Sequence, residues 1–496
     1  MSDQQFDLII VGAGINGAGI ARDATLRGLK VLLLDKGDIG AGTSSWSTKM
    51  IHGGLRYLEH YEFGLVRKAL KERDTLARIA KHLVTPLRLN IPNEPHTRPA
   101  RLVKLGLFLY DNLYRSQFLP KSVQFDLKTS AVGTALKKDS GTAFAYSDLR
   151  VDDHRLVIAN AKDAKSHGAE VIPSARVVKV EAIKKQWHIT YMHKAIKHTV
   201  TAPKFVNATG PWASQFMEDA APDLPNKPLK LIKGSHIVVP KLFLHDQAYL
   251  FQQEDGRVVF AIPFQRDFTL VGTTEELMEG DPGQAKISDA ERTCLLGIAN
   301  ERFSKQTTEA DIVWDYSGVR PIIDAKHGLT KASRDYSLQT FKSKGAIGLN
   351  VWGGKLTTYR TLAKDAMKKL KIKGQCLTGD LPLYGTQENF DVKAFQKKYP
   401  AIPMAVTQRL AESYGTAAEH ILEGCTDISS LGEHFGATLY AREVEYLMNE
   451  EWAASVNSII WHRTKQGLFI NEEQKKKLSE YMLHKFHDSK KESLIT

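Results

Sequence analysis

A glycine-rich turn near the start of the chain constrains the fold more than any other feature of the sequence. Residues 6–11 predict a buried parallel strand, and Gly12, Gly14 and Gly17 follow it as GxGxxG. The first glycine permits the tight turn, the second lets a pyrophosphate approach the backbone, and the third lets the next helix pack on the strand. The turn therefore predicts a dinucleotide site.

The segments after the turn complete a βαβ unit. Residues 15–27 predict a helix that Gly28 ends, and residues 30–34 predict a second strand that ends at Asp35. The first amides and the dipole of the helix favour phosphate groups, and the Asp35 carboxylate suits ribose hydroxyls. Asp35 argues against NADP, because its charge would repel a 2′-phosphate.

This unit does not distinguish FAD from NAD, since both contain adenosine diphosphate. The rest of the sequence has no second glycine fingerprint of equal quality, whereas a flavoenzyme reduced by NADH commonly carries two. We therefore favour tightly held FAD with an organic molecule as the electron donor.

The length of the chain limits the number of domains, and its net charge limits the kinds of partner. The 496 residues are enough for about two to four domains. A formal net charge of +12 suits an anionic partner, namely a phosphorylated substrate, acidic lipid or nucleic acid, although it also serves solubility alone. The three cysteines, Cys294, Cys376 and Cys425, form no CxxC pair. We therefore expect no metal site and no disulfide framework, and a reducing compartment.

The sequence predicts a cytoplasmic protein. It has no run of about 18 apolar residues and no basic, cleavable leader. Residues 102–114 are apolar and aromatic with flanking cations, which is typical either of a segment in the membrane interface or of a core helix. The lysine-rich tail, which holds Lys475, Lys476, Lys477, Lys485, Lys490 and Lys491, is typical of a solvated helix or of a second membrane contact.

Several longer motifs resemble one family. They are TSSWSTKMIHGGLRYL (43–58), VNATGPW (206–212), KGSHIVVP (233–240), YSGVRP (316–321), GGKLTTYR (353–360) and the segment 429–467. Together they resemble the FAD-dependent (aerobic, quinone-linked) glycerol-3-phosphate dehydrogenase family over nearly the whole chain. One departure is Asp35, where the family more often has glutamate.

The resemblance implies an α/β fold. We expect a Rossmann-like FAD-binding domain of the glutathione-reductase/amino-acid-oxidase type, an inserted antiparallel β substrate domain and a helical C-terminal domain. The expected boundaries are 1–80, 145–215 and 340–384 for the FAD-binding domain, 81–144 and 216–339 for the substrate domain, and 385–496 for the helical domain. The helical domain either caps the fold or supports a homodimer, and the sequence leaves both open.

The resemblance also implies the reaction. A hydride would leave C2 of sn-glycerol 3-phosphate for the flavin N5, giving dihydroxyacetone phosphate, and the electrons would pass to ubiquinone or menaquinone in the membrane. The protein would sit on the inner face of the cell membrane, attracted by anionic lipid. The phosphate dianion needs fixed cations, the developing carbonyl oxygen needs donors, and the hydroxyl proton needs an acceptor.

The matched motifs supply these groups. For the substrate pocket we predict Arg56, Tyr57, Arg320, Arg334 and Lys355. Arginine binds an oxyanion through two parallel hydrogen bonds, whereas lysine does not. Arg320 and His236 are the predicted catalytic residues, with His236 as general base because a neutral imidazole accepts a proton near pH 7.

The same motifs give the cofactor contacts, and no cysteine lies in a motif for covalent flavin, so we predict noncovalent FAD. The predicted contacts are Gly12, Gly14, Ile15, Asn16, Gly17, Asp35, Lys36, Thr43, Ser44, Ser45, Lys49, His52, Gly53, Gly54, Val177, Thr209, Gly210, Gly354, Lys355, Leu356 and Thr357.

Three alternatives differ in chemistry. An oxidase of the same substrate would use oxygen instead of quinone. A flavin-dependent RNA-modifying enzyme would suit the net charge, but the sequence shows no RNA-binding module, zinc knuckle or catalytic CxxC, so we expect no nucleic acid partner. A noncatalytic flavoprotein that binds a phosphorylated ligand is the third.

Overall fold

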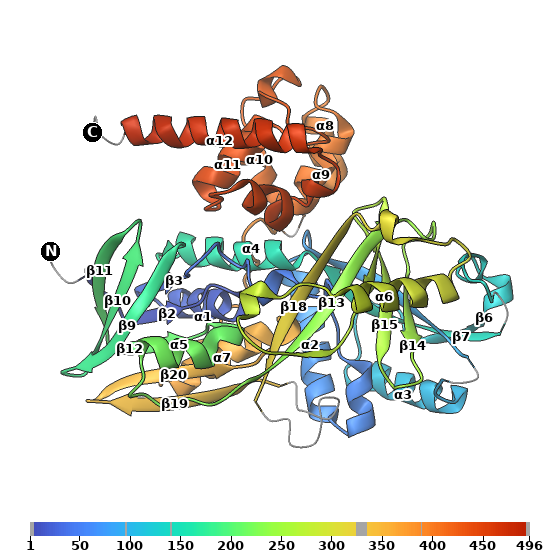
Figure 1. Cartoon of the computed structure of the whole chain (residues 1–496), viewed down its shortest axis with the longest axis horizontal. Helices are drawn as coiled ribbons and strands as arrows, with labels where there is room; N and C mark the ends of the chain where they lie inside the picture. Colours follow the sequence, from blue (N-terminus) through green and yellow to red (C-terminus); the bar gives the residue numbers. More distant parts are fainter. Residues whose placement is uncertain (1–3, 95–96, 139–140, 324–334, 388, 493–496) are drawn as a thin grey trace.

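The computed structural model describes residues 4–94, 97–138, 141–323, 335–387 and 389–492. It divides into two adjoining β-sheet units and a helical domain that lies above them in Figure 1. None of the helices within the described ranges combines the length and the apolar character that crossing a bilayer requires.

The first unit is built on a six-stranded sheet that contains the predicted βαβ motif. Its strands, in spatial order, are β19 (Ser337–Ser343), β20 (Ala346–Trp352), β12 (Lys204–Asn207), β2 (Leu8–Val11), β3 (Val31–Leu34) and β8 (Glu170–Ile172). Helices α1 (Ile15–Leu26), α4 (Asp153–Ser166) and α7 (Tyr359–Lys369) cover one face. The central strands β2 and β3 are apolar throughout, because both of their faces are buried.

A smaller sheet covers the other face. It contains β1 (Gln4–Gln5), β11 (Ile196–Ala202), β10 (Gln186–His193) and β9 (Ala175–Ile183), and α5 (Ala213–Ala220) packs beside it. Alternate residues of β2 therefore face different cores: Leu8 and Ile10 pack on the helices, whereas Ile9 and Val11 pack toward the small sheet.

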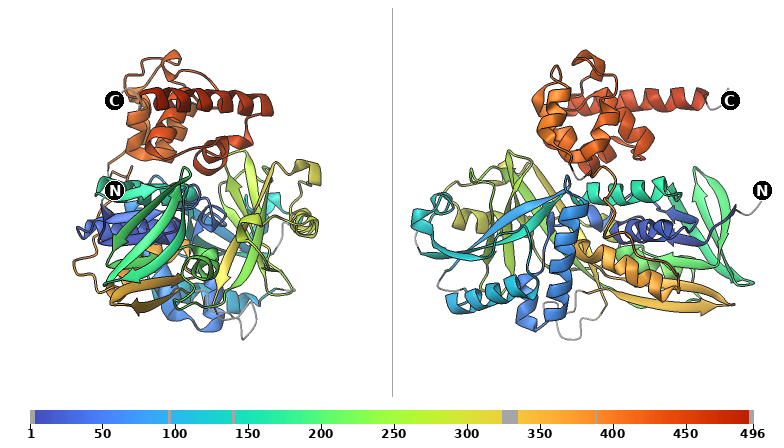
Figure 2. Two further views of the ribbon diagram at one scale, coloured as in Figure 1. Left: turned by 60° about the vertical axis from the view of Figure 1, so that its left-hand side comes forward. Right: turned by 180° about the vertical axis from the view of Figure 1, so that it is seen from behind.

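The second unit is a ten-stranded sheet that Figure 2 shows beside the first. Its strands are β4 (Met50–Ile51), β5 (Val84–Pro92), β6 (Val123–Asp126), β7 (Thr142–Val151), β13 (Lys230–Pro240), β14 (Ala248–Gln252), β15 (Val258–Phe264), β16 (Phe268–Gly272), β17 (Glu276–Met278) and β18 (Trp314–Ile322). Helices α2 (Phe63–Ile79) and α3 (Ala100–Leu113) cover one face, and α6 (Asp289–Arg302) covers the other.

The helical domain has a separate hydrophobic core. It contains α8 (Val392–Lys398), α9 (Met404–Tyr414), α10 (Ala418–Ile421), α11 (Ala441–Glu450), the π-helix Ser458–Arg463 and α12 (Glu472–Glu492). Figure 1 shows α12 running out beyond the domain, above α4.

Three strands lie outside the domains expected for them. β4 (Met50–Ile51), expected in the FAD-binding segment 1–80, pairs with β7 in the ten-stranded sheet, and β19 begins at Ser337 in the six-stranded sheet although the substrate segment was expected to reach residue 339. We expected the FAD-binding domain to resume at residue 145, but β7 (Thr142–Val151) pairs with β5 and lies in the ten-stranded sheet. Because β7 pairs along its whole length, it belongs to one sheet only. The chain therefore passes from the ten-stranded unit to the six-stranded unit after Val151. The other domain boundaries stay predictions.

Candidate active site

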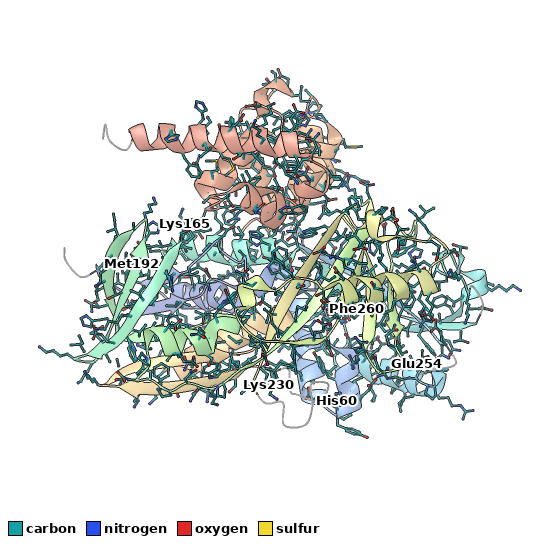
Figure 3. The ribbon with its side chains drawn as sticks, in the orientation of Figure 1. His60, Lys165, Met192, Lys230, Glu254 and Phe260 are labelled. Carbon is teal, nitrogen blue, oxygen red and sulfur yellow. The ribbon has the colours of Figure 1, made fainter. Side chains whose placement is uncertain are left out.

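A cavity of about 1650 Å³ lies between the two sheet units. The glycine turn and the ends of β3 and β12 line one end of it. Side chains of the ten-stranded sheet and of the short helix Leu55–His60 line the other end. His60 and Phe260, both labelled in Figure 3, belong to that second end. A single cavity thus joins the predicted nucleotide site to the predicted substrate pocket.

The glycine turn fits a dinucleotide. Gly12 has φ of +99°, and a Cβ there would lie 2.5 Å from the carbonyl oxygen of Ala208. A Cβ at Gly17 would lie 1.8 Å from the carbonyl oxygen of Gly12. Gly17 is therefore required by packing and does not line the cavity, whereas Gly12 and Gly14 do.

The start of α1 presents polar groups to the cavity. The N–H of Ile15 donates to Ser44 Oγ at 3.0 Å, which leaves the hydroxyl proton of this serine for another acceptor. Asn16 donates through Nδ2 to the carbonyl oxygen of Gly353 at 3.1 Å. Its buried Oδ1 has no hydrogen-bond partner among the described residues. The positive end of the α1 dipole and the hydroxyl of Ser44 suit a phosphate, whereas Asn16 Oδ1 is an acceptor and suits a donor on a ligand.

Asp35 stands where β3 ends, as predicted. Its carboxylate accepts the N–H of Ala13 at 2.7 Å and the N–H of Gly37 at 2.9 Å. Burial raises the pKa of Asp35, and these two hydrogen bonds oppose that rise without cancelling it. The carboxylate is held at the cavity wall, and each oxygen keeps a lone pair for a ribose hydroxyl. Lys36 also lines the cavity, with Nζ 4.3 Å from the centre of the Trp212 ring.

The other predicted cofactor contacts on the cavity come from several elements. Thr43 donates to the carbonyl oxygen of Val319 at 2.7 Å, which ties the loop after β3 to β18. Thr357 Oγ1 accepts the N–H of His52 at 3.3 Å, which ties the start of α7 to the loop after β4. The cavity wall also includes Gly54, Val177, Thr209, Gly210, Gly354 and Leu356.

The substrate end of the cavity is rich in cations. Lys355 has a buried ammonium group with no hydrogen-bond partner among the described residues, and it lies 3.8 Å from the centre of the Tyr57 ring. Arg320 Nη1 lies 3.6 Å from Glu275 Oε1. Arg56 lines the same end. Because a buried charge without a partner is costly, this arrangement favours an anionic ligand.

Among the cavity residues that the sequence analysis missed, Arg257 and Glu275 carry charge at the substrate end. Arg257, just before β15, lines the substrate end and pairs with Asp255 at 2.6 Å, and Glu275 faces Arg320. Neither lies in a motif that carried the resemblance. The only local signal was their charge beside strands of the predicted antiparallel sheet.

His236 lies behind the cavity wall. It is 1 % exposed, its ring stacks on Tyr316 at 4.8 Å, and it does not line the cavity. Its Nε2 lies 3.0 Å from the hydroxyl oxygen of Thr48, which does line the cavity. Burial, followed by the charges of Arg320 and Lys49, holds the pKa of His236 well below 6.5. The imidazole is therefore neutral, and any proton it takes from the cavity must pass through Thr48.

Three further predicted cofactor contacts lie off the cavity. The Lys49 ammonium is buried and pairs with Asp153 at 2.8 Å. Ser45 is bonded to His154 Nδ1 at 2.6 Å, and the N–H of Gly53 donates to Tyr110 Oη at 2.8 Å. These three residues stand in the layer behind the cavity wall, where the contacts just given hold them.

Arg334 lies outside the described residues. Within the described ranges, His, Cys, Asp and Glu side chains form no group that suits a metal ion.

Comparison with protein families divides the chain in two. Residues 7–360 match the family described as FAD dependent oxidoreductase. Residues 376–490 match the C-terminal domain of alpha-glycerophosphate oxidase.

Curated relatives match over almost the full length. A glycerol-3-phosphate dehydrogenase of Pseudomonas aeruginosa is 42% identical, with 96% of this chain and 95% of the relative covered. The aerobic glycerol-3-phosphate dehydrogenase of Escherichia coli is 41% identical, with 96% and 97% covered. A D-erythritol 1-phosphate dehydrogenase of Brucella abortus is 39% identical, with 95% and 96% covered.

The fold also matches a solved structure. The glycerol-3-phosphate dehydrogenase of Bacillus halodurans, complexed with FAD, aligns with a TM-score of 0.74 and 26% identity, covering 98% of this chain and 95% of that one. The expected fold class is thereby confirmed.

Proposed function

The chain belongs to the FAD-dependent oxidoreductase family and groups there with the glycerol-3-phosphate dehydrogenases, and from this premise we propose that it oxidises sn-glycerol 3-phosphate to dihydroxyacetone phosphate. The observation that carries the proposal is the buried ammonium of Lys355, which has no hydrogen-bond partner within the described part of the chain and shares one cavity with Arg320, Arg56 and the glycine turn.

The cavity residues fit FAD. The turn at Gly12 and Gly14, the first amides of α1 and Ser44 would hold the pyrophosphate, and Asp35 would hold the ribose. When bound, FAD supplies the acceptor for the hydride from C2 of the substrate. Thr209, Gly210 and Thr357 belong to the same wall, whereas Ser45, Lys49 and Gly53 lie behind it.

The cations at the other end bind and orient the substrate. Arg320 and Arg56 each present a planar set of donors that match a phosphate, and Lys355 adds a charge that water does not screen. The ion pair with Glu275 fixes the direction of the Arg320 guanidinium. Three cations that hold the phosphate would fix the orientation of a small phosphorylated alcohol, so that a single carbon would face the cofactor.

Removal of the hydroxyl proton is the remaining step. His236 stays the proposed base, now acting through Thr48, whose hydroxyl oxygen lies 3.0 Å from Nε2. The low pKa of His236 keeps it neutral, so it accepts a proton only as the alcohol is oxidised. His52, on the cavity wall, is the alternative acceptor.

We also propose quinone as the electron acceptor and a membrane surface as the place of transfer. Leu102, Leu105 and Phe108 of α3 are 52%, 53% and 61% exposed, whereas Val103 and Leu107 on its opposite face are buried in the core. Arg101 and Lys104 are exposed on the same helix. This is the amphipathic pattern of a helix that lies in the headgroup region of a bilayer.

The tail contributes less to this surface. Lys475, Lys476, Lys477 and Lys485 of α12 each lie within 4.0 Å of a glutamate oxygen. Their charges are largely balanced on the protein itself, which supports the solvated-helix interpretation.

One titration tests the activity and its substrate. Under anaerobic conditions the yellow holoprotein should bleach with sn-glycerol 3-phosphate and not with glycerol. D-erythritol 1-phosphate, the substrate named in the Brucella relative, is the essential competitor, because bleaching at lower concentration by that compound would reassign the substrate. A quinone analogue should then restore the yellow colour. Restoration by oxygen with stoichiometric peroxide would identify an oxidase.

A further inference from the structure

The loop after β3 has one side on the cavity and the other side on the helical domain. Residues 35–38, 40–44 and 46–48 line the cavity. Within this loop, Asp38 receives two hydrogen bonds from Arg463, at 2.6 and 2.7 Å, and lies 3.1 Å from His462 Nδ1. Residues more than 400 positions apart in sequence thus meet directly behind the predicted nucleotide site.

Arg463 is also bonded within the helical domain. Its side chain is fully buried, at the end of the π-helix Ser458–Arg463. Besides Asp38, it donates to the carbonyl oxygen of Glu451 at 2.6 and 3.2 Å and to that of Ser458 at 3.3 Å. A buried guanidinium with these bonds is fixed in place. It therefore fixes the position of the Asp38 carboxylate, and with it the loop after β3.

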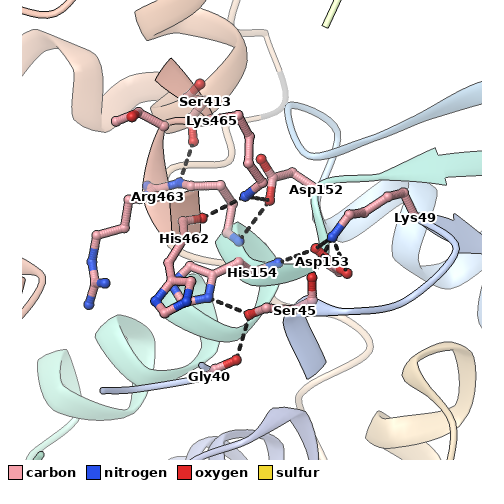
Figure 4. A network of polar contacts seen from close by, with 12 residues as sticks. Gly40, Ser45, Lys49, Asp152, Asp153, His154, Ser413, His462, Arg463 and Lys465 are labelled. Atoms are coloured by element: carbon pink, nitrogen blue, oxygen red, sulfur yellow. Dashed lines mark hydrogen bonds and ion pairs between the residues drawn. The ribbon is translucent and has the colours of Figure 1, made fainter. Parts of the chain in front are cut away.

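His462 makes a second attachment to the same loop. Its ring stacks on His154 at 5.2 Å and meets the Trp46 ring edge-on at 5.6 Å. His154 Nδ1 in turn lies 2.6 Å from Ser45 Oγ, which also bonds the carbonyl oxygen of Gly40. Figure 4 shows the hydrogen bonds that run from His154 through Ser45 to Gly40, with the His462 ring beside that of His154. Asp38, Gly40, Ser45 and Trp46 are therefore all held from one side.

A different contact between the domains serves as a comparison. Arg266 and Glu412 form an exposed pair at 3.3 Å, and both side chains are more than half exposed. Neither residue lines the cavity. Loss of this pair would remove a link between the domains without releasing the loop.

From these contacts we propose that Arg463 and His462 are positioning residues for the FAD site. The helical domain holds the loop from Asp38 to Trp46 in the shape that the cofactor requires, so that the affinity for FAD, and not only the stability of the fold, depends on this domain. The proposal rests on the assignment of FAD to the cavity. It explains why a domain that contributes no cavity residue among the described ranges carries a fully buried arginine at this place.

The test compares the release of FAD from three full-length holoproteins: the wild type, Arg463→Gln and Arg266→Gln. Each is diluted to nanomolar concentration, and the rise in flavin fluorescence gives the dissociation rate and the dissociation constant. We expect Arg463→Gln to weaken FAD binding at least tenfold and Arg266→Gln to change it less than twofold. Equal FAD affinity in all three, or equal weakening in both variants, would overturn the proposal.

Two further measurements keep the outcome unambiguous. If Arg463→Gln does not fold, Asp38→Asn and His462→Phe replace it. The first keeps an acceptor oxygen at the loop, and the second keeps the ring stack but removes the hydrogen bond. Weakened FAD binding under conditions in which the apoprotein remains folded supports a positioning role, and a loss of thermal stability with the FAD affinity unchanged contradicts it. A wild type that binds no FAD would instead reject the cofactor assignment on which the proposal rests.

Discussion

The ammonium nitrogen of Lys355 lies 3.8 Å from the centre of the Tyr57 ring, and it has no hydrogen-bond partner among the described residues. The face of an aromatic ring stabilises a cation by about 1 kcal/mol, which is less than a charged hydrogen bond contributes. The side chain is therefore oriented but not neutralised. A phosphate dianion would supply the missing partner.

Replacement of Lys355 should weaken substrate binding more than cofactor binding. We expect Lys355→Met to lower kcat/KM by about 100-fold, mainly through KM, because one charge-assisted hydrogen bond to the phosphate is lost. Steady-state kinetics with sn-glycerol 3-phosphate measures this. Lys179→Met, at an exposed pair with Glu181, is the control and should behave as wild type. A variant with normal KM would remove Lys355 from the phosphate site.

The packing at Gly17 predicts the effect of the smallest side chain. A Cβ there would lie 1.8 Å from the carbonyl oxygen of Gly12, so Gly17→Ala should distort the turn and give colourless protein. Gly64→Ala is the matched control, because a Cβ at this helical position meets nothing within 4 Å. The ratio of flavin to protein absorbance decides the question, and a normal ratio in Gly17→Ala would contradict the predicted pyrophosphate site.

The contact between Thr48 and His236 predicts two linked kinetic effects. Thr48→Val and His236→Asn should each lower kcat by about 10- to 100-fold with little change in KM, because each breaks the same proton path. The double variant should be no slower than the slower single variant. If both retain the wild-type rate while His52→Asn does not, His52 is the proton acceptor.

The same path predicts the pH dependence. Because burial and neighbouring cations place the pKa of His236 well below 6.5, the base stays deprotonated as the pH falls through 6.5. The loss of kcat/KM on the acid side should therefore begin well below the pH at which a solvated histidine titrates. A midpoint near pH 6.5 that persists in His236→Asn would belong to another group.

Asp38 predicts a stability effect with a defined sign. Its hydrogen bonds to Arg463 and His462 outweigh burial and lower its pKa from 3.8 to about 2. A carboxyl whose pKa is lower in the folded state stabilises the fold above its unfolded pKa, and this contribution disappears as the pH falls from 3.8 toward 2. It amounts to about 2 kcal/mol. In denaturant unfolding, Asp38→Asn should be less stable than wild type at pH 7, and the difference should shrink in acid.

The exposed face of α3 predicts the mode of membrane binding. Leu105→Glu together with Phe108→Glu should abolish sedimentation with anionic vesicles, since two charges would enter the apolar layer. Leu244→Glu, at a side chain that is 90% exposed elsewhere on the surface, should not. Binding by Leu105 and Phe108 should also resist salt, whereas binding by lysines alone would be lost at high ionic strength.

Local features were predictable from the sequence because their causes are local. The turn at Gly12, the helix Ile15–Leu26 and the acid at Asp35 follow from backbone freedom, apolar pattern and strand length within about 30 residues. The predicted ends of these elements differ only slightly from those in the structure. The type of cation needed for a phosphate was predictable as well, since chemistry alone restricts it to arginine and lysine.

The sequence by itself thus determined the nucleotide turn, the family and the kinds of side chain in the pocket. Only the tertiary structure decided which of them reach the cavity, because that depends on pairings between distant strands. Arg320 stands opposite Ile232 in the register of β18 on β13, and the same sheet places His236 one layer deeper. The contact between Asp38 and Arg463 was likewise decided by the tertiary structure. It forms because the helical domain, which has a separate core, docks on the loop after β3, and no local sequence pattern predicts it.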